Sequence, residues 1–136
     1  MDQLITRRIK DFGDAIASLK EAVDRKDIDV VFRRDTALLR FELAAEFAPK
    51  VTRQILDAVY SVQVSIPKEV FREALQARLV SEDDTEMLLE MVDDRNRMVH
   101  DYNERFADTL FKKVVEAYAP VPNRLYDTLR KKSERE

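Results

Sequence analysis

Apolar residues recur every three or four positions along most of the chain, which is the spacing of one face of an α-helix. The pattern predicts helices over about 2–25, about 29–60, about 67–79 and about 82–102. A last helix is predicted from about 104, bent or broken where Pro120 and Pro122 remove backbone donors. The sequence therefore predicts an all-α protein, with an antiparallel up-and-down helical bundle of four to five helices as the default architecture.

Capping residues mark several of the predicted boundaries. Asp29, at the end of a short Asp-Ile-Asp connection, is expected to cap the second helix, and Ser81 is expected to cap the fourth. Ser65 is the expected cap of the third helix, with Pro67 in its first turn. Pro49 lies inside the second helix, where a bend is expected.

Composition narrows the class of protein. The 136 residues, 45% of them hydrophobic, fit one domain, which we expect over residues 1–130, followed by a frayed charged tail over 131–136. The absence of cysteine excludes disulfides and thiolate metal sites, and one histidine cannot form a histidine-rich zinc site, so we expect no metal and no other cofactor. Without a run of about 18 apolar residues, a cytoplasmic protein with no membrane partner is expected.

Charge gives no global attraction to nucleic acid. The chain holds 24 basic and 27 acidic residues, a net charge of −3. Any surface that binds RNA must therefore be local. The candidates are the pair Arg33-Arg34, the pair Arg95 and Arg97, and the run Arg130-Lys131-Lys132.

The candidate chemistry lies between Arg95 and Tyr102, which flank the single histidine, His100. Histidine exchanges protons near neutral pH, and arginine presents a cationic fork that suits phosphate. Together they suggest a phosphodiester substrate. Five residues of helix leave the side chains of Arg95 and His100 about 140° apart, so one helix brings them together poorly. Two chains related by a twofold axis would form a composite site, which is our hypothesis.

Arg95 falls on the predicted apolar stripe of the fourth helix, an unusual place for a guanidinium. It must reach solvent, line a cleft or pair with a carboxylate, for which Glu42 and Glu46 on the second helix are candidates. A purely structural alternative makes the chain a dimerisation module with a buried Arg95–Glu42 ion pair. In that alternative Tyr102 is a core aromatic residue and His100 interacts with a helix end.

Arg95, His100 and Tyr102 form an R-x4-H-x-Y pattern, with Asn96 directly after the arginine. This pattern resembles the signature of HepT-type proteins in the HEPN superfamily. Outside it, segments 34–42, 67–79 and 88–102 resemble the nucleotidyltransferase substrate-binding protein family. The resemblance covers about residues 29–118.

The resemblance implies a homodimer that acts, in toxin members, as a metal-independent endoribonuclease with Arg95 and His100 in a cleft between protomers. Asn96 and Glu42 are expected as supporting residues. The implied partner is a separate minimal nucleotidyltransferase, an antitoxin that transfers AMP onto Tyr102. The alternative is a non-catalytic subunit that binds substrate or nucleotide for that enzyme. The chain itself lacks the Gly-Ser turn that a nucleotidyltransferase needs.

Overall fold

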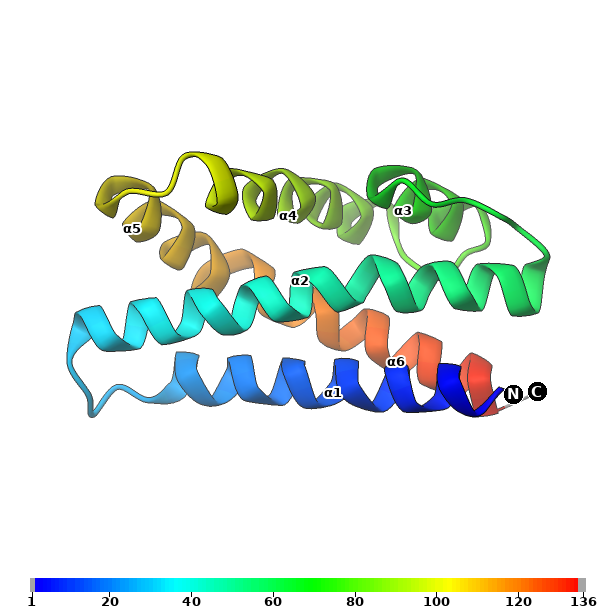
Figure 1. Ribbon diagram of the computed structural model, residues 1–136, viewed down its shortest axis with the longest axis horizontal. Coiled ribbons are helices and arrows are strands. Elements are labelled where there is room, and N and C mark those ends of the chain that lie inside the picture. Colours follow the sequence, from blue (N-terminus) through cyan, green and yellow to red (C-terminus); the bar gives the residue numbers. More distant parts are fainter. Residues whose placement is uncertain (1, 135–136) are drawn as a thin grey trace.

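The computed structural model describes residues 2–134, and the regular secondary structure in that range is entirely helical, which confirms the all-α prediction. Long helices run alternately up and down along one axis, and a short helix lies at one end (Figure 1). The elements are α1 (Gln3–Asp24), α2 (Val30–Tyr60), α3 (Pro67–Gln76), α4 (Glu82–His100), α5 (Glu104–Lys113), the π-helical segment η1 (Val114–Tyr118) and α6 (Pro120–Glu134).

Helix α2 is the centre of the bundle. It contacts each of the other five α-helices, and its inward face carries fully buried residues such as Phe41, Val51 and Ile55. It continues through Pro49 as one helix. The single glycine, Gly13 on α1, lies under a ring of α6: a Cβ there would come within 2.7 Å of the Tyr126 ring. No helix in residues 2–134 has the length and apolar character to cross a membrane.

The described chain has six α-helices, more than the four to five expected, because η1 divides the last predicted helix. In η1 the backbone widens by one residue per turn, and the Ala119 amide donates to the carbonyl of Val114. Pro120 follows and has no amide to continue the ladder. The predicted interruption is confirmed, and it falls directly before Pro120.

Two predicted caps are confirmed. The carboxylate of Asp29 accepts hydrogen bonds from the amides of Val31 and Phe32 at 3.0 and 3.2 Å. The hydroxyl of Ser81 accepts from the amide of Asp84 at 3.1 Å. Each side chain satisfies amides that the first helical turn leaves unpaired.

The start of α3 corrects a third prediction. Ile66, not Ser65, occupies the cap position, and it makes no side-chain hydrogen bond. Pro67 opens the helix as predicted, and its fixed φ angle suits that position. The helix ends at Gln76 rather than near 79 because Arg78 takes a left-handed conformation, with φ of 61°.

The expected frayed tail is wrong for residues 131–134, which are the last turn of α6. Buried Leu129 anchors this end of the helix, and Arg130 pairs with Glu134 at 3.2 Å. The ammonium of Lys132 lies 6.0 Å from the ring centroid of Tyr60 at the end of α2. Residues 135 and 136, also part of the expected tail, lie outside the described range.

Candidate functional site

The core-facing side of α4 differs from the predicted stripe. Its buried positions follow one another at intervals of three: Thr85, Leu88, Met91 and Asp94. Arg95 lies at the edge of this face, with its side chain 33% exposed, and Val99, about one turn further along, is exposed. The helix therefore directs the Asp94 carboxylate into the core and leaves the Arg95 guanidinium at the edge of the core.

Asp94 is tolerated in the core because η1 and the end of α5 supply partners. Its Oδ2 accepts a hydrogen bond from the Tyr118 hydroxyl at 2.5 Å and pairs with Lys113 at 3.0 Å. The Tyr118 ring stacks on Phe41 of α2, with centroids 5.7 Å apart. Burial, and then the hydrogen bond to Asp94, raise the pKa of the Tyr118 phenol. Sequence reasoning missed this pair, although the interval of three from Leu88 through Asp94 was visible.

The raised pKa of Tyr118 predicts a loss of stability in alkali. Above the ordinary tyrosine pKa of about 10, an unfolded chain gives up the phenolic proton while the folded chain keeps it. The unfolded state then binds fewer protons, so the free energy of unfolding falls as pH rises. Urea unfolding between about pH 8 and pH 11 should show this decline, and Tyr118→Phe should make it shallower. Tyr126→Phe, at a half-buried ring, is the matched control, and equal slopes for both variants would contradict the prediction.

Arg95 pairs across to α2. Its Nη2 lies 3.8 Å from Oε2 of Glu46. The other carboxylate oxygen, Oε1, accepts a hydrogen bond from Lys50 at 3.1 Å. Of the two carboxylates proposed as partners, Glu46 is therefore the one in contact. Glu42 is half-buried and makes no ion pair with any residue in 2–134. Nε of Arg95 is buried without a hydrogen-bond partner in the same range.

A cavity of about 330 Å³ opens beside this pair, between α2, α4 and the start of α3. Arg95 and Asn96 line it from α4, so the structure brings these two predicted residues together. The cavity is lined from α2 by Glu46, Lys50 and Arg53. Sequence reasoning did not single out the two α2 cations, because their positions opposite Arg95 depend on how α2 and α4 pack.

The exposure of the Arg95–Glu46 pair changes what an arginine deletion should do. A buried ion pair would make Arg95→Ala cost about 3–5 kcal/mol. A pair at 3.8 Å with side chains 33% and 43% exposed is a surface contact worth about 1 kcal/mol or less. We therefore expect Arg95→Ala to leave the thermal melting curve nearly unchanged. A large drop in Tm would restore the structural alternative, in which Arg95 serves only the core.

His100 is exposed and is the last residue of α4, which ends two residues before the predicted Tyr102. The helix stops there because Asn103 is extended, with φ of −150°, and its side chain accepts from the amide of Phe106 to begin α5. Tyr102 therefore lies in a connection rather than on the helix. Its ring is 47% exposed and meets the Phe106 ring edge to face, with centroids 6.1 Å apart.

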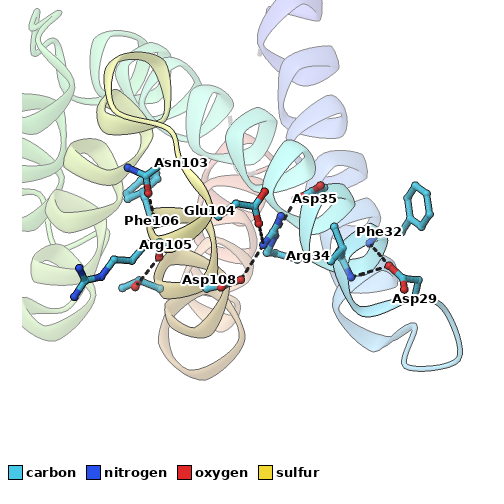
Figure 2. A network of polar contacts seen from close by, with 11 residues as sticks. Asp29, Phe32, Arg34, Asp35, Asn103, Glu104, Arg105, Phe106 and Asp108 are labelled. Carbon is cyan, nitrogen blue, oxygen red and sulfur yellow. Dashed lines mark hydrogen bonds and ion pairs between the residues drawn. The ribbon is translucent and has the colours of Figure 1, made fainter.

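A buried arginine joins the start of α5 to α2 next to Tyr102. Figure 2 shows Arg34 of α2 among three carboxylates, and it donates to Asp35 at 2.9 Å, Glu104 at 2.7 Å and Asp108 at 2.9 Å. Arg34 is only 5% exposed, so it cannot contribute to a basic surface as the pair Arg33-Arg34 was expected to. Partial burial, and then the negative charge of Asp35, raise the pKa of the Tyr102 phenol.

Exposed apolar residues lie on α2 and α4 at the levels between the Arg95–Glu46 pair and Tyr102. Helices α2 and α4 are antiparallel neighbours (Figure 1). Residues that precede Glu46 on α2 therefore lie beside residues that follow Arg95 on α4. Four apolar residues share these levels, each between 47% and 59% exposed: Leu39, Leu43, Val99 and Tyr102. We call these four the apolar patch. Contiguous exposed apolar surface commonly marks an interaction site.

Within one chain, Arg95 and His100 are separated by about 7.5 Å along the α4 axis and by about 140° around it. Arg95 faces α2 and the cavity, whereas His100 is exposed at the end of α4 and does not line that cavity. A single chain therefore presents two half-sites. Among residues 2–134, no group of three or more histidine, aspartate or glutamate side chains has the arrangement of a metal site.

Comparison with known proteins shows to which family this chain belongs. The family model described as "Nucleotidyltransferase substrate binding protein like" matches residues 7–131. A crystal structure of a Thermus thermophilus protein is similar over 88% of this chain and 98% of its own, with 33% identity and a TM-score of 0.79. No curated protein matches the chain. The chain belongs to the nucleotidyltransferase substrate binding protein-like family.

More distant structures share the fold. A tri-AMPylated Shewanella oneidensis HEPN toxin, solved in complex with its MNT antitoxin, matches 96% of this chain and 99% of its own at 19% identity, with a TM-score of 0.76. A toxin–antitoxin solved with AMP-PNP matches 95% of this chain and 99% of its own at 18% identity, with a TM-score of 0.74. The bundle is thus the fold of HEPN toxins.

Proposed function

We propose that the chain is a HepT-like toxin of a toxin–antitoxin pair. In this proposal a homodimer cleaves RNA without a metal ion at a composite site of Arg95 and His100. A separate minimal nucleotidyltransferase, the antitoxin, silences it by transferring AMP onto Tyr102. The observation that carries the proposal is the exposure of His100 and Tyr102 at the end of α4, outside the core that shaped the rest of that helix.

The chemistry needs only these side chains. His100 takes the proton from an RNA 2′-hydroxyl or protonates the leaving 5′-oxygen, and Arg95 stabilises the charge that gathers on the phosphorane. The products are a 2′,3′-cyclic phosphate and a 5′-hydroxyl. Glu46 at 3.8 Å orients the Arg95 guanidinium without enclosing it. Asn96, on the same cavity, is placed to donate a hydrogen bond to the bound strand.

A dimer through the apolar patch would form the composite site. The four residues lie on α2, on α4 and in the connection after it, at levels between Arg95 and Tyr102. A twofold axis through it would bring the half-site of one protomer toward that of its partner, and twofold interfaces use the same surface on both subunits. Sedimentation should give a dimer for the wild-type chain. Leu43→Glu should shift it toward a monomer, because it places a charge in the patch.

The proposed silencing follows from the position of Tyr102. Its hydroxyl attacks the α-phosphorus of ATP, pyrophosphate leaves, and the phenolic proton passes to a base of the transferase. The adenylyl group then adds bulk and negative charge beside His100, which opposes RNA phosphate. The Shewanella oneidensis HEPN toxin, which has the same fold, was solved in its tri-AMPylated form.

The direct test is incubation of the purified chain with RNA in the presence of EDTA. We expect cleavage products that end in 2′,3′-cyclic phosphate, identified by mass spectrometry. Intact RNA at every enzyme concentration, with the transferase absent and the dimer verified, would refute the nuclease.

A second function, a non-catalytic subunit that supplies substrate or nucleotide to a nucleotidyltransferase, is favoured by the cavity at Arg95, which charged and apolar side chains line together. It predicts saturable nucleotide binding only when the transferase is present. Normal activity of the transferase after deletion of this chain would exclude it.

A further inference from the structure

A polar groove continues from the Arg95 cavity along the carboxyl-terminal half of α2. The cavity and the neighbouring hollow share Arg53 and Ser65 in their linings. They therefore form one groove between α2, α4 and the connection over residues 61–66. It runs from Arg95 at one end to Gln54 and Asp57 at the other. We call it the α2 groove.

The Arg95 end of the α2 groove is positively charged in a chain whose net charge is −3. Lys50, Arg53 and Arg95 line the cavity, and Glu46 is the one carboxylate among its lining residues, which leaves a net charge of +2 there. Asp57 lines the other end, so the whole groove carries a net charge of +1. Arg53 is exposed and forms no ion pair with a carboxylate in residues 2–134. This excess favours an anionic ligand.

Two buried polar atoms point to the shape of that ligand. Across residues 2–134, the buried side-chain nitrogen and oxygen atoms without a hydrogen-bond partner are Nε of Arg95 and Oε1 of Gln54. Both residues line the α2 groove, one at each end. Solvent does not reach either atom as the side chains stand, so a ligand meets them only if those side chains turn. A ligand that accepts at the Arg95 end and donates at the Gln54 end would then satisfy both atoms, which are unfavourable without partners.

A nucleotide has this arrangement. Its phosphate only accepts hydrogen bonds, and its sugar and base carry hydroxyl and amino donors. Between the two ends, Pro49, Pro67 and Val92 give the cavity an apolar lining against which a sugar or base can pack. The cavity volume of about 330 Å³ lies at the lower end of the range for small-ligand sites.

We propose that the α2 groove binds a nucleotide, with its phosphate held by Lys50, Arg53 and Arg95 and its nucleoside directed toward Gln54. The proposal rests on the proposed function where it takes this nucleotide to be part of an RNA strand, next to the phosphate that Arg95 and His100 attack. A free nucleotide offers the same phosphate chemistry, and the experiment separates the two sources.

The test measures binding rather than cleavage. A fluorescent single-stranded oligonucleotide, fully 2′-O-methylated so that it cannot be cut through its 2′-hydroxyls, is titrated with the wild-type chain and with Lys50→Gln and Arg53→Gln. Loss of a charge-assisted contact should raise Kd about tenfold in each variant. It should also flatten the dependence of log K on log salt by about 0.7 for each lost phosphate contact. Fluorescent ATP is titrated in a parallel arm.

The matched controls, Lys10→Gln and Arg7→Gln, remove the same charges from exposed positions on α1, on the other side of α2 from α4 (Figure 1). They should bind as the wild type does. Weaker binding by Lys50→Gln and Arg53→Gln, but not by the controls, supports the groove. If binding of the oligonucleotide is weakened, the ligand is RNA; if only binding of ATP is weakened, the ligand is a free nucleotide. Equal binding by the groove and control variants, or no binding by the wild type, overturns the proposal that the α2 groove binds a nucleotide.

The outcome is independent of the nuclease. Groove-dependent binding without cleavage would refute the proposed function and leave the groove in place. Cleavage by the wild type, together with unchanged binding and cleavage in Lys50→Gln and Arg53→Gln, would refute the groove and leave the proposed function in place.

Discussion

Replacement of His100 by alanine is expected to reduce RNA cleavage by about 10²- to 10⁴-fold, the usual contribution of a general acid or base. The fold should be unchanged, because His100 is exposed at the end of α4 and none of the hydrogen bonds or ion pairs within residues 2–134 involves its side chain. Cleavage is measured as the initial rate of cyclic-phosphate formation, with circular dichroism to verify the helices.

Two comparisons sharpen the His100 experiment. Binding of a 2′-O-methylated strand should be unaffected, which separates loss of chemistry from loss of substrate. Arg95→Ala should also abolish most cleavage while the melting curve stays near that of the wild type. A mixed dimer of His100→Ala and Arg95→Ala chains should regain one composite site and part of the rate. If this mixture stays as inactive as its parents, the site does not lie between protomers.

Tyr102→Phe is expected to abolish adenylylation completely, because it removes the oxygen that attacks ATP and little else. The ring packing against Phe106 is retained, so the connection should keep its conformation. With the transferase and ATP, the wild-type chain should gain the mass of at least one adenylyl group and lose nuclease activity. Tyr102→Phe should gain no mass and remain active.

The control for Tyr102 is Tyr60→Phe on α2, which should be modified and silenced like the wild type. A tyrosine phenol is protonated at neutral pH, so the transferase must supply the base, and the raised pKa of Tyr102 strengthens that requirement. Adenylylation of Tyr102→Phe at the wild-type level would place the target on another residue.

Much of the fold was predictable from local pattern. The spacing of apolar residues located α1, α2 and α4, and the side chains of Asp29 and Ser81 marked two of their starts. These features depend on neighbours within one or two turns of helix, so the sequence contains them directly. The end of α4 was placed two residues late, because capping of α5 by Asn103 competes with continuation of the helix.

The candidate site was predictable only in part. The residue types in the Arg95–Tyr102 segment are enough to indicate phosphate chemistry, because a guanidinium and an imidazole carry it wherever they lie. Their surroundings depended on packing: Arg95 meets Glu46 rather than Glu42, and Tyr102 lies beside the buried Arg34 cluster. Lys50 and Arg53 belong to the same cavity because antiparallel α2 and α4 bring distant segments together.

The sequence by itself determined that the chain is helical, where most of its helices begin, and which residues have the chemistry for an Arg–His site. Tertiary structure alone decided which side of α4 enters the core. Asp94 is buried because Tyr118 and Lys113, far along the chain, satisfy its carboxylate. That choice leaves Arg95 at the edge, because consecutive residues on a helix differ by about 100° and α4 buries only a narrow row of residues at intervals of three.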